Sequence, residues 1–523
     1  MKPIRWLLAV FFIGICFQSC HEKNINVNSH LSLDDYKSLD TTIYHINARK
    51  IREHIGFLCR SDKDSMAPDY RTRKYYKSNY SFLWIDRKGI DGRADSLIDC
   101  LQNITRIGFS KNKFRLPRIE SDLQRLRNLD FDGSDNSINK VLARLEYNLT
   151  KAYFRYVSGQ RFGFMNPKYV LNHVDVHEQK ENTVTYRTLY DIKTERAGDR
   201  FYRTAMSMIR EDSIADFIRK AEPNDEVYDS LERLLQSPGL SRMQRNRILV
   251  NMERCRWRMQ DNPQRHEKYV LVNIPSFHLR AVDGDKVLTM RIAFGSNKNK
   301  TPLIVSAIKR MDVNPQWVMP KSIVRKSVVP QLGNINYFTQ NRYFIRNRQT
   351  GEHVDVSSVS PEMLESGDYF VIQRGGEGNA MGRIVFRFDN NLSIYLHDTS
   401  SRTIFDRSVR NVSHGCIRVE KPFELSKFVL AKKDDKLVDR INYSMHADVS
   451  PVNMKKEEMT ERMMLVADTL DRSRLIGSVN IKPMVPIFIL YYTMYPDASG
   501  KIETFSDVYG YDSLIYQQLR NYI

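Results

Sequence analysis

The spacing of apolar residues divides the chain into a helical part and a strand-rich part. Between residues 66 and 260, apolar positions recur every three or four residues, which is the spacing of one buried helix face. The longest stripe, at residues 138–156, consists of Val141, Leu142, Leu145, Leu149, Ala152 and Tyr153. Further helices are predicted at 94–101, 202–221, 224–235 and 244–259. From Lys268 onward short β-type runs replace the stripes. The pattern therefore predicts an α+β chain, with an α-helical domain at 66–260 before a mostly β domain at 261–523.

The β part is expected to form one sheet that two insertions interrupt. Its predicted strands are 269–275, 278–282, 286–294, 369–373, 383–388, 393–396, 485–492 and 501–505. Asp283 and Gly284 are expected to form the turn between the second and third of these strands. A helix is predicted to follow from Pro422 to residue 431, with the proline in its first turn.

The first insertion spans about residues 318–367 and the second about residues 432–482, which contains a charged helix at 455–470. Four aromatic residues of the first insertion predict a packed element: Tyr337, Phe338, Tyr343 and Phe344. The alternative for this insertion is a disordered surface loop.

The N-terminus is predicted to be a signal peptide rather than part of the fold. Lys2 and Arg5 precede an apolar run of residues 6–17, which is too short to span a bilayer, a distance of about 20 residues. Residues 17–20 form a loose lipobox, so cleavage after residue 19 would leave Cys20 to carry a lipid. The alternative is cleavage nearby without a lipid. Residues 20–65 are then a tether and a short helix, and the protein is expected in the periplasm or cell envelope as a membrane-anchored lipoprotein.

Export changes the meaning of the net charge of +19. In a cytosolic protein this charge would indicate nucleic acid as a partner, whereas outside the membrane anionic wall polymers or lipid surfaces are expected instead. The alternative is that Lys and Arg merely solvate helix faces. Among the six cysteines, two of Cys59, Cys100 and Cys255 could form one disulfide, although no spacing is diagnostic. Cys416 is the only cysteine from residue 268 onward.

The segment from Tyr395 to Pro422 carries the candidate chemistry. The strand at 393–396 delivers His397, and a polar loop leads to Ser413, His414, Gly415, Cys416, Ile417 and Arg418. A thiol nucleophile needs a base that takes its proton and donors that hold the oxyanion. His397 can be the base and Cys416 the nucleophile, while Gly415 permits a tight turn that directs backbone N–H groups at the substrate. Arg418 can clamp a substrate carboxylate. The alternative is a buried, inert cysteine in a turn.

This segment resembles the active-site segment of L,D-transpeptidases, the family with a YkuD-type catalytic domain. Its signature is a histidine at a strand end, about sixteen residues, then S/T-H-G-C and often an arginine; here Ser413 follows His397 by sixteen residues. Other landmarks are Thr301 with Pro302, residues 314–317, residues 373–382 and residues 507–512. The helical part resembles the scaffold of the long, YcbB-like branch. The small peptidoglycan-binding module of many long members is not recognisable.

The resemblance implies a reaction and a site. Cys416 would be acylated by a peptidoglycan tetrapeptide stem, with His397 as base, and a neighbouring stem would resolve the thioester to give a 3→3 cross-link. His414, Gly415 and Cys416 would build the oxyanion site, with Ser413 and Asp398 orienting the turn and the imidazole. Substrate contacts are implied for Arg418, Tyr395 and Asn379, and the insertion at 318–367 would be a lid. The resemblance implies no metal or organic cofactor, no nucleic acid, and sensitivity to carbapenems.

Four other interpretations of these residues compete with this one. Water instead of an amine would make the enzyme an L,D-carboxypeptidase, and a dead site would leave a wall-binding scaffold. A zinc site of His397, His414 and Cys416 is disfavoured, because no carboxylate motif completes a metal hydrolase. The glycine-rich residues 375–382 do not predict a nucleotide loop, because a strand and not a helix follows them.

Overall fold

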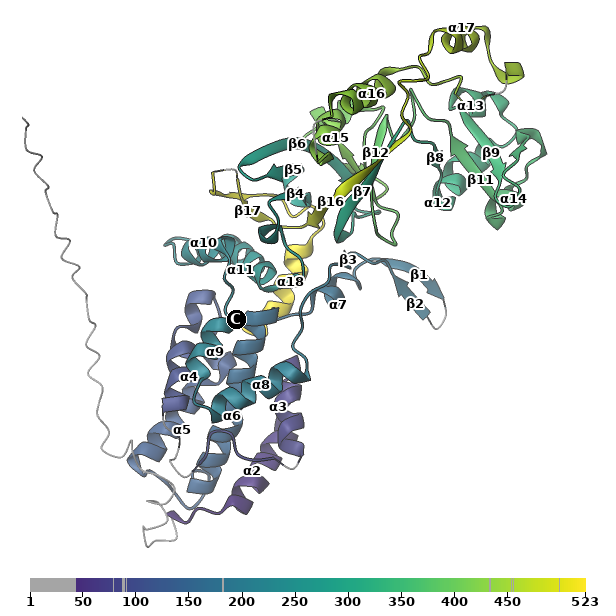
Figure 1. Ribbon diagram of the computed structural model, residues 1–523. Helices are drawn as coiled ribbons and strands as arrows, with labels where there is room; N and C mark the ends of the chain where they lie inside the picture. The colour runs from purple at the N-terminus through teal and green to yellow at the C-terminus, as the bar shows by residue number, and fades with distance from the viewer. Residues whose placement is uncertain are drawn as a thin grey trace, which may run out of the picture. The chain divides into compact units, whose positions relative to one another are not determined.

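The computed structural model describes residues 44–523 except 79, 87–89, 91, 181–182, 432–433, 453, 455 and 498. The chain divides into two compact units (Figure 1). Unit 1 contains the described residues up to Asn103, together with 111–155 and 202–217, and unit 2 contains the remainder. The predicted signal peptide, the lipidation site Cys20 and the tether up to residue 43 lie outside the described residues. No helix of the described ranges has both the length and the apolar character that crossing a membrane requires.

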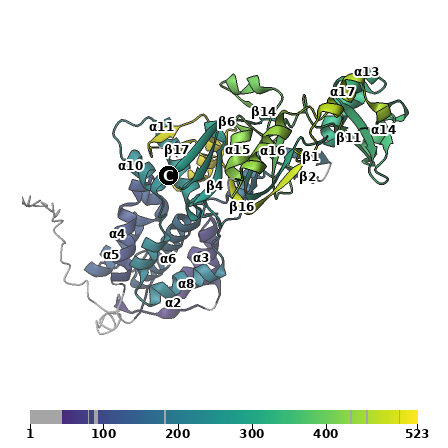
Figure 2. The same ribbon diagram turned by 45° about the horizontal axis from the view of Figure 1, so that its top comes forward.

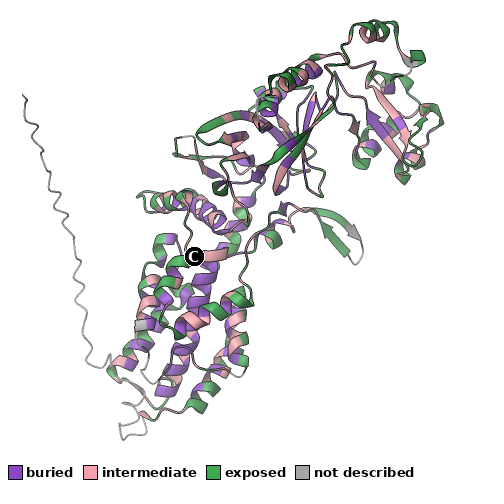
Figure 3. Ribbon diagram, in the orientation of Figure 1, coloured by how far each residue is buried: buried purple, intermediate pink, exposed green. Residues whose placement is uncertain are grey.

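Unit 1 is built from helices around α6 (Ile138–Phe162), which is buried along most of its length (Figure 3). The other helices are α2 (Ala48–Ser61), α3 (Ala67–Lys77), α4 (Gly92–Gln102), α5 (Leu116–Asn128), α8 (Asp199–Arg210) and α9 (Ile214–Ala221). Residues 156–162 of α6, 199–201 of α8 and 218–221 of α9 belong to unit 2. Every residue of the predicted stripe at 138–156 is buried, so this prediction is confirmed. Because neighbours cover α6 on several sides, polar residues on it are buried as well and need partners.

Glu146 shows how unit 1 meets that need. Its carboxylate accepts hydrogen bonds from the backbone N–H groups of Leu83 (2.6 Å), Trp84 (2.9 Å) and Ile85 (3.2 Å). It also accepts one from the hydroxyl of Tyr76 at 2.8 Å. The segment 83–85 forms no regular ladder of its own, so this one side chain satisfies three consecutive buried donors.

Unit 2 contains a β-sheet that closes on itself. The order is β12-β13-β15-β6-β5-β4-β16-β7, and β7 also pairs with β12. The bounds are β4 (Lys268–Asn273), β5 (His278–Asp283), β6 (Lys286–Gly295), β7 (Leu303–Val313), β12 (Ile384–Phe388), β13 (Leu396–His397), β15 (Ile417–Val419) and β16 (Ser478–Leu490). The short strands β3 (Tyr190–Asp191) and β14 (Asn411–Ser413) add to β7 and β6. Closure removes the exposed sheet edges between these eight strands.

Helices α10 (Glu226–Leu235), α11 (Arg242–Arg256) and α18 (Tyr511–Leu519) also belong to unit 2. The units therefore differ from the predicted boundary at residue 260. The reason is a set of polar contacts across 240 or more residues: the side chain of Asn251 accepts from the backbone N–H of Thr493 at 3.0 Å, and Arg254 pairs with Asp512 at 2.7 Å. Apolar periodicity carries no information about such distant partners.

One turn and one hairpin differ from the sequence prediction. Asp283 ends β5 and pairs with Lys286, so the connecting residues are Gly284 and Asp285 rather than Asp283 and Gly284. A hairpin of β1 (Val176–Lys180) and β2 (Thr183–Tyr186) lies in the part expected to be mainly helical. These hairpin residues are largely exposed, so no apolar pattern marked them.

The first insertion folds around its own small core, which confirms the prediction of a packed element. A four-stranded sheet has the order β10-β9-β11-β8, with bounds His353–Val354, Tyr343–Asn347, Tyr369–Gln373 and Trp317–Val318. Helices α12 (Lys321–Ile323), α13 (Ile335–Gln340) and α14 (Pro361–Ser366) accompany it, and Val328, Phe338, Ile345 and Leu364 are among its buried residues. Placing 369–373 in the main sheet was wrong, because a strand's burial pattern does not say which sheet it joins.

The second insertion contains α16 (Asp435–His446), which lies along β7 (Figures 1 and 2), and α17 (Glu461–Thr469). The predicted charged helix corresponds to α17, whereas α16 was not predicted. Helix α15 (Pro422–Val429) begins at its proline as expected. Residues 501–505 were expected to pair back on the main sheet, but β18 (Ile502–Thr504) pairs with β17 (Met494–Pro496) in a separate two-stranded sheet.

Candidate active site

The candidate base and nucleophile lie on neighbouring strands. Strands β13 and β15 are parallel, with Leu396 opposite Ile417 and His397 opposite Arg418. Cys416 precedes Ile417, so it lies beside Tyr395, two residues before His397. Because side chains alternate along a strand, Cys416, Arg418 and His397 project from the same face. The closed sheet thus brings together residues that are nineteen positions apart in the sequence.

The strand that delivers His397 is shorter than predicted. Residues 393–395 are not part of β13, and Ser393 has a left-handed φ of +56°. The side chain of Asn390 closes this turn by accepting hydrogen bonds from the N–H groups of Leu392 and Ile394, both at 3.0 Å.

His397 is buried and oriented by the backbone. Its Nδ1 lies 2.5 Å from the carbonyl oxygen of Asp398. A carbonyl only accepts, so Nδ1 carries the proton and Nε2 is the unprotonated nitrogen of the neutral ring, the one that can act as a base. Burial, and then the positive charge of Arg418, lower the pKa of His397 to about 4, although the carbonyls of Asp398 and Met381 oppose this shift. His397 is therefore neutral at physiological pH.

The carboxylate of Asp398 does not orient the imidazole, in contrast to our expectation. It accepts hydrogen bonds from the backbone N–H of Arg383 (2.9 Å) and from the guanidinium of Arg402 (3.1 Å). The main-chain carbonyl of Asp398 holds His397 instead. Sequence reasoning could not find this contact, because any residue type supplies a carbonyl.

Cys416 is half-buried, and its thiol donates to the carbonyl of Ser393 at 3.5 Å. Burial raises the pKa of this thiol, while the backbone N–H of Tyr395 and the charges of Arg418 and Arg387 lower it by less. The resting site therefore holds a neutral thiol beside a neutral imidazole. Catalytic hydrogen bonds often form only in the complex with substrate, so the Ser393 contact describes the free protein.

The turn before Cys416 is closed by side-chain hydroxyls. The hydroxyl of Ser413 donates to the Cys416 carbonyl (2.6 Å) and accepts from the Gly415 N–H (3.1 Å). Gly415 has a φ of +121°, and its carbonyl accepts from Thr301 Oγ1 at 2.7 Å. Ser413 thus joins both ends of the turn through its hydroxyl, and its orienting role in catalysis stays a prediction. The oxyanion site was expected to use His414, Gly415 and Cys416. The N–H of Gly415, however, already donates to the Ser413 hydroxyl within the turn.

Arg418 is a partly buried cation with unused hydrogen-bonding capacity. Its Nε is buried without a hydrogen-bond partner in the part of the chain that the structure describes. Burial also lowers the pKa of Arg418. A buried guanidinium without an acceptor is costly, which is typical of a group that waits for an anionic ligand.

Two segments of the chain match known protein families. Residues 267–450 match the model of the L,D-transpeptidase catalytic domain (YkuD), and residues 70–235 match that of a scaffold domain. The chain contains an L,D-transpeptidase catalytic domain preceded by a scaffold domain. It is also 25% identical over 499 residues to a Haemophilus influenzae protein named "Putative L,D-transpeptidase", covering 93% of this chain and 88% of that protein. The predicted mostly β catalytic domain after a helical scaffold is confirmed.

Tyr395 and Asn379, both expected to contact substrate, differ in their surroundings in the L,D-transpeptidase domain. The ring of Tyr395 lies under the guanidinium of Arg387, 4.9 Å from it, and faces a cavity. Asn379 is buried and bonded within its own loop: its amide accepts from the Met381 N–H (2.7 Å) and donates to the Arg374 carbonyl (2.9 Å). Asn379 thereby positions Met381, whose carbonyl faces His397. Its direct contact with substrate stays a prediction.

His414 is exposed. Burial of part of its ring, followed by the charges of Lys326 and Arg418, lowers the pKa of His414. Lys326 belongs to the segment 324–328 of the first insertion. The insertion therefore acts electrostatically on the nucleophile turn, while its role as a lid stays a prediction.

Gly382 is the residue of the glycine-rich loop that lies closest to Asp398, whose carbonyl holds His397. Its φ is +65°, and a Cβ there would lie 2.5 Å from Cβ and Cγ of Asp398. We expect Gly382→Ala to displace Asp398 and His397 and to lower turnover at least about tenfold, since misplaced catalytic groups lose that much or more. Steady-state turnover and the thermal midpoint of the full chain measure this effect.

Gly378→Ala is the matched control. Gly378 also has a positive φ, +76°, but no atom lies within 4 Å of a Cβ built there. It isolates backbone strain, of order 1–3 kcal/mol, from the clash. Equal losses of turnover in the two variants would show that contact with Asp398 is unimportant.

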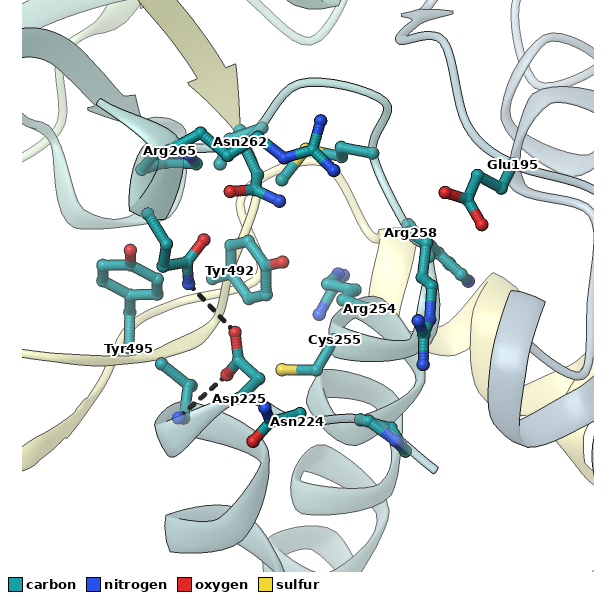
Figure 4. A pocket seen from close by; sticks show the side chains of 17 residues that line it. Glu195, Asn224, Asp225, Arg254, Cys255, Arg258, Asn262, Arg265, Tyr492 and Tyr495 are labelled. Atoms are coloured by element: carbon teal, nitrogen blue, oxygen red, sulfur yellow. Dashed lines mark hydrogen bonds between the residues drawn. The ribbon is translucent and has the colours of Figure 1, made fainter. Parts of the chain in front are cut away.

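A second cysteine faces a cavity, but no histidine is among the described residues that line this cavity. The cavity has a volume of about 250 Å³, and the side chains of Cys255 and Asp225 both face it (Figure 4). Burial raises the pKa of Cys255 well above its usual value. None of the four described cysteines forms a disulfide bond, and no metal-binding cluster of His, Cys, Asp or Glu occurs among the described residues. Cys416 alone among these thiols has a histidine on the adjacent strand.

Proposed function

We propose that the protein forms 3→3 peptidoglycan cross-links through a thioester on Cys416. The observation that carries the proposal is the face of β13 and β15, where Cys416, His397 and the unsatisfied Arg418 lie side by side. The catalytic-domain match supports a peptidoglycan substrate. Membrane attachment through Cys20 and residence in the periplasm are part of the same proposal.

In the first half-reaction Arg418 holds a carboxylate of the donor tetrapeptide stem. The thiol turns from Ser393 toward the imidazole, and Nε2 of His397 takes its proton as Sγ attacks the carbonyl before the terminal D-Ala. A C–S bond forms and the C–N bond breaks. The departing amine receives the proton from His397, so D-Ala leaves as a neutral amine.

The second half-reaction reverses these roles. The side-chain amine of a neighbouring stem attacks the thioester, a C–N bond forms and the C–S bond breaks. His397 takes a proton from the attacking amine and returns it to sulfur. The N–H of Tyr395, which lowers the pKa of the thiol, stabilises the departing thiolate. Water in place of the amine would give the carboxypeptidase reaction.

Mass spectrometry of purified muropeptides incubated with the full-length protein tests this proposal. With wild-type protein we expect a cross-linked dimer together with free D-Ala. With Cys416→Ala the muropeptides should remain unchanged. Trimmed monomers without dimers would identify a carboxypeptidase instead, and unchanged muropeptides would contradict any catalytic role.

The neutral resting pair makes a separate prediction about pH. His397, with a pKa of about 4, is neutral above pH 5, and the Cys416 pKa lies above its ordinary value. The rate of iodoacetamide alkylation at Cys416 should therefore keep rising up to at least about pH 9, because thiolate accumulates only there. A stable thiolate–imidazolium pair would instead give a rate that levels off below neutral pH. Peptide mapping measures the rate at this site, with Cys416→Ser as the blank.

A further inference from the structure

The cavity that Cys255 faces is separate from the candidate active site. Its lining comes from the N-terminus of α10, the end of α11, the segment between α11 and β4, and residues 490–495, with Glu195 at one side (Figure 4). All of these belong to unit 2. Its volume of about 250 Å³ is that of about eight molecules of liquid water, at about 30 Å³ each, so it suits a small molecule.

Asn262 brings an unsatisfied amide to this cavity. Its Oδ1 is buried and has no hydrogen-bond partner within the part of the chain that the structure describes. Asn262 precedes the short turn Pro263–Arg265, where an asparagine side chain usually caps the backbone, but it makes no cap hydrogen bond here. A buried acceptor without a donor costs stability, so Asn262 is suited to receive an O–H or N–H group of a ligand.

Tyr492 and Tyr495 form an aromatic wall with two available hydroxyls. Their ring centroids lie 5.2 Å apart. Neither hydroxyl is bonded to another described residue, and burial raises the pKa of both, so both remain protonated and can donate. Rings of this kind offer an apolar face together with a polar tip, which matches a ligand ring that carries hydroxyl groups.

Two guanidinium groups of the lining have only neutral partners. Arg258 donates to the main-chain carbonyls of Ala221 (3.4 Å) and Glu222 (3.1 Å), and Arg265 donates to that of Gln260 (2.6 Å). No described carboxylate forms an ion pair with either arginine. Both therefore keep donors for an anion, and a carboxylate would form charge-assisted hydrogen bonds with them.

The two carboxylates of the lining are already engaged. Glu195 pairs with Arg161 at 3.5 Å. Asp225 accepts from the backbone N–H groups of Val227 (2.9 Å) and Tyr228 (3.0 Å) and from the side chain of Gln264 (3.0 Å). Because these acids have their own partners, they do not neutralise the two arginines.

We propose that this cavity binds a sugar acid, a monosaccharide that carries one carboxylate. Arg258 and Arg265 hold the carboxylate, Asn262 accepts from a hydroxyl or amide N–H group, and the sugar ring lies against Tyr492 and Tyr495. The site is independent of the proposed function, because Cys416, His397 and Arg418 do not line the cavity.

Isothermal titration calorimetry of the full-length protein with two sugar acids tests the proposal. N-acetylmuramic acid is compared with neutral N-acetylglucosamine, and glucuronic acid with neutral glucose, so the two pairs distinguish an acidic amino sugar from a uronic acid. We expect one acid or both to bind with a Kd at least about tenfold below that of the neutral counterpart, as for a charge-assisted contact. Equal affinities within both pairs, or no binding of any of the four sugars, would overturn the proposal.

Arg258→Gln combined with Arg265→Gln should weaken binding of the acid about tenfold and abolish the preference over the neutral sugar. Arg242→Gln combined with Arg245→Gln is the matched control. It removes the same charge from exposed positions at the other end of α11, and Arg242 lies roughly 18 Å along the helix axis from Arg254. The control should keep both the affinity and the preference. A cavity variant that also keeps them would overturn the assignment.

Asn262→Ala separates a contact with the ligand from a role in the fold. Its amide gains no hydrogen bond through Oδ1 in the free protein, so the variant should keep or raise the thermal midpoint while weakening binding of the acid about tenfold. A lowered midpoint with unchanged affinity would overturn the assigned contact.

Cys255 reports where the ligand binds, because its thiol faces the cavity (Figure 4). Saturating sugar acid should slow alkylation of Cys255 by iodoacetamide at pH 9 several-fold, as peptide mapping measures, whereas Cys100 of unit 1 should react at an unchanged rate. Binding of the acid without protection of Cys255 would overturn this cavity as the site.

Discussion

Cys416→Ser should lower cross-linking turnover by at least about 10³-fold, since removing a nucleophile eliminates the covalent route. The serine hydroxyl would face the same half-buried position beside a His397 whose pKa is lowered to about 4. Such an imidazole is too weak a base for an alcohol at neutral pH. Turnover is measured from D-Ala release and dimer formation.

A carbapenem gives the same variant a second readout. Wild-type protein should gain the mass of one drug molecule at Cys416, and Cys416→Ser should not. Cys100→Ser is the control, because Cys100 belongs to α4 of unit 1 and should leave both readouts unchanged. An adduct that maps to Cys59, Cys100 or Cys255 in wild-type protein would refute Cys416 as the nucleophile.

Glu146→Ala should destabilise unit 1 by about 3–5 kcal/mol, at the upper end of single-residue effects. The substitution leaves the buried N–H groups of Leu83, Trp84 and Ile85 without their acceptor, and it also removes one of the partners of the Tyr76 hydroxyl, which keeps Thr150 Oγ1 at 2.7 Å. Each unsatisfied buried donor costs roughly 1–3 kcal/mol. Urea denaturation of the full chain, followed by the helical circular dichroism signal, measures the shift.

Glu120→Ala provides the comparison for this experiment. Glu120 is an exposed carboxylate of α5, bonded only at the surface to Gln102 at 3.3 Å among the described residues. Its loss should change the stability by less than about 0.5 kcal/mol. If Glu146→Ala were equally mild, water or a rearranged segment 83–85 would have to satisfy the freed donors.

The candidate site was largely predictable because its chemistry is local in sequence. Cys416, Ser413, Gly415 and Arg418 lie within six residues, and a tight turn followed by a strand fixes their relative placement. The segment also predicted that His397 and Cys416 lie near each other, and the register of β13 and β15 puts His397 opposite Arg418, two residues after Cys416. The roles of main-chain groups were not predictable, and neither was the use of the Asn379 amide within its own loop.

The sequence by itself determined where helices give way to strands, which face of α6 is buried, and which thiol has a histidine nearby. These properties depend on spacing over a few residues. Only the tertiary structure decided that β11 joins the insertion's sheet, that residues 218–260 fold with the strand-rich unit, and that Arg258 and Asn262 share a cavity with Tyr492. Those outcomes depend on partners up to hundreds of residues away. Strand pairing and buried polar contacts select such partners through geometry, which periodicity along the chain does not encode.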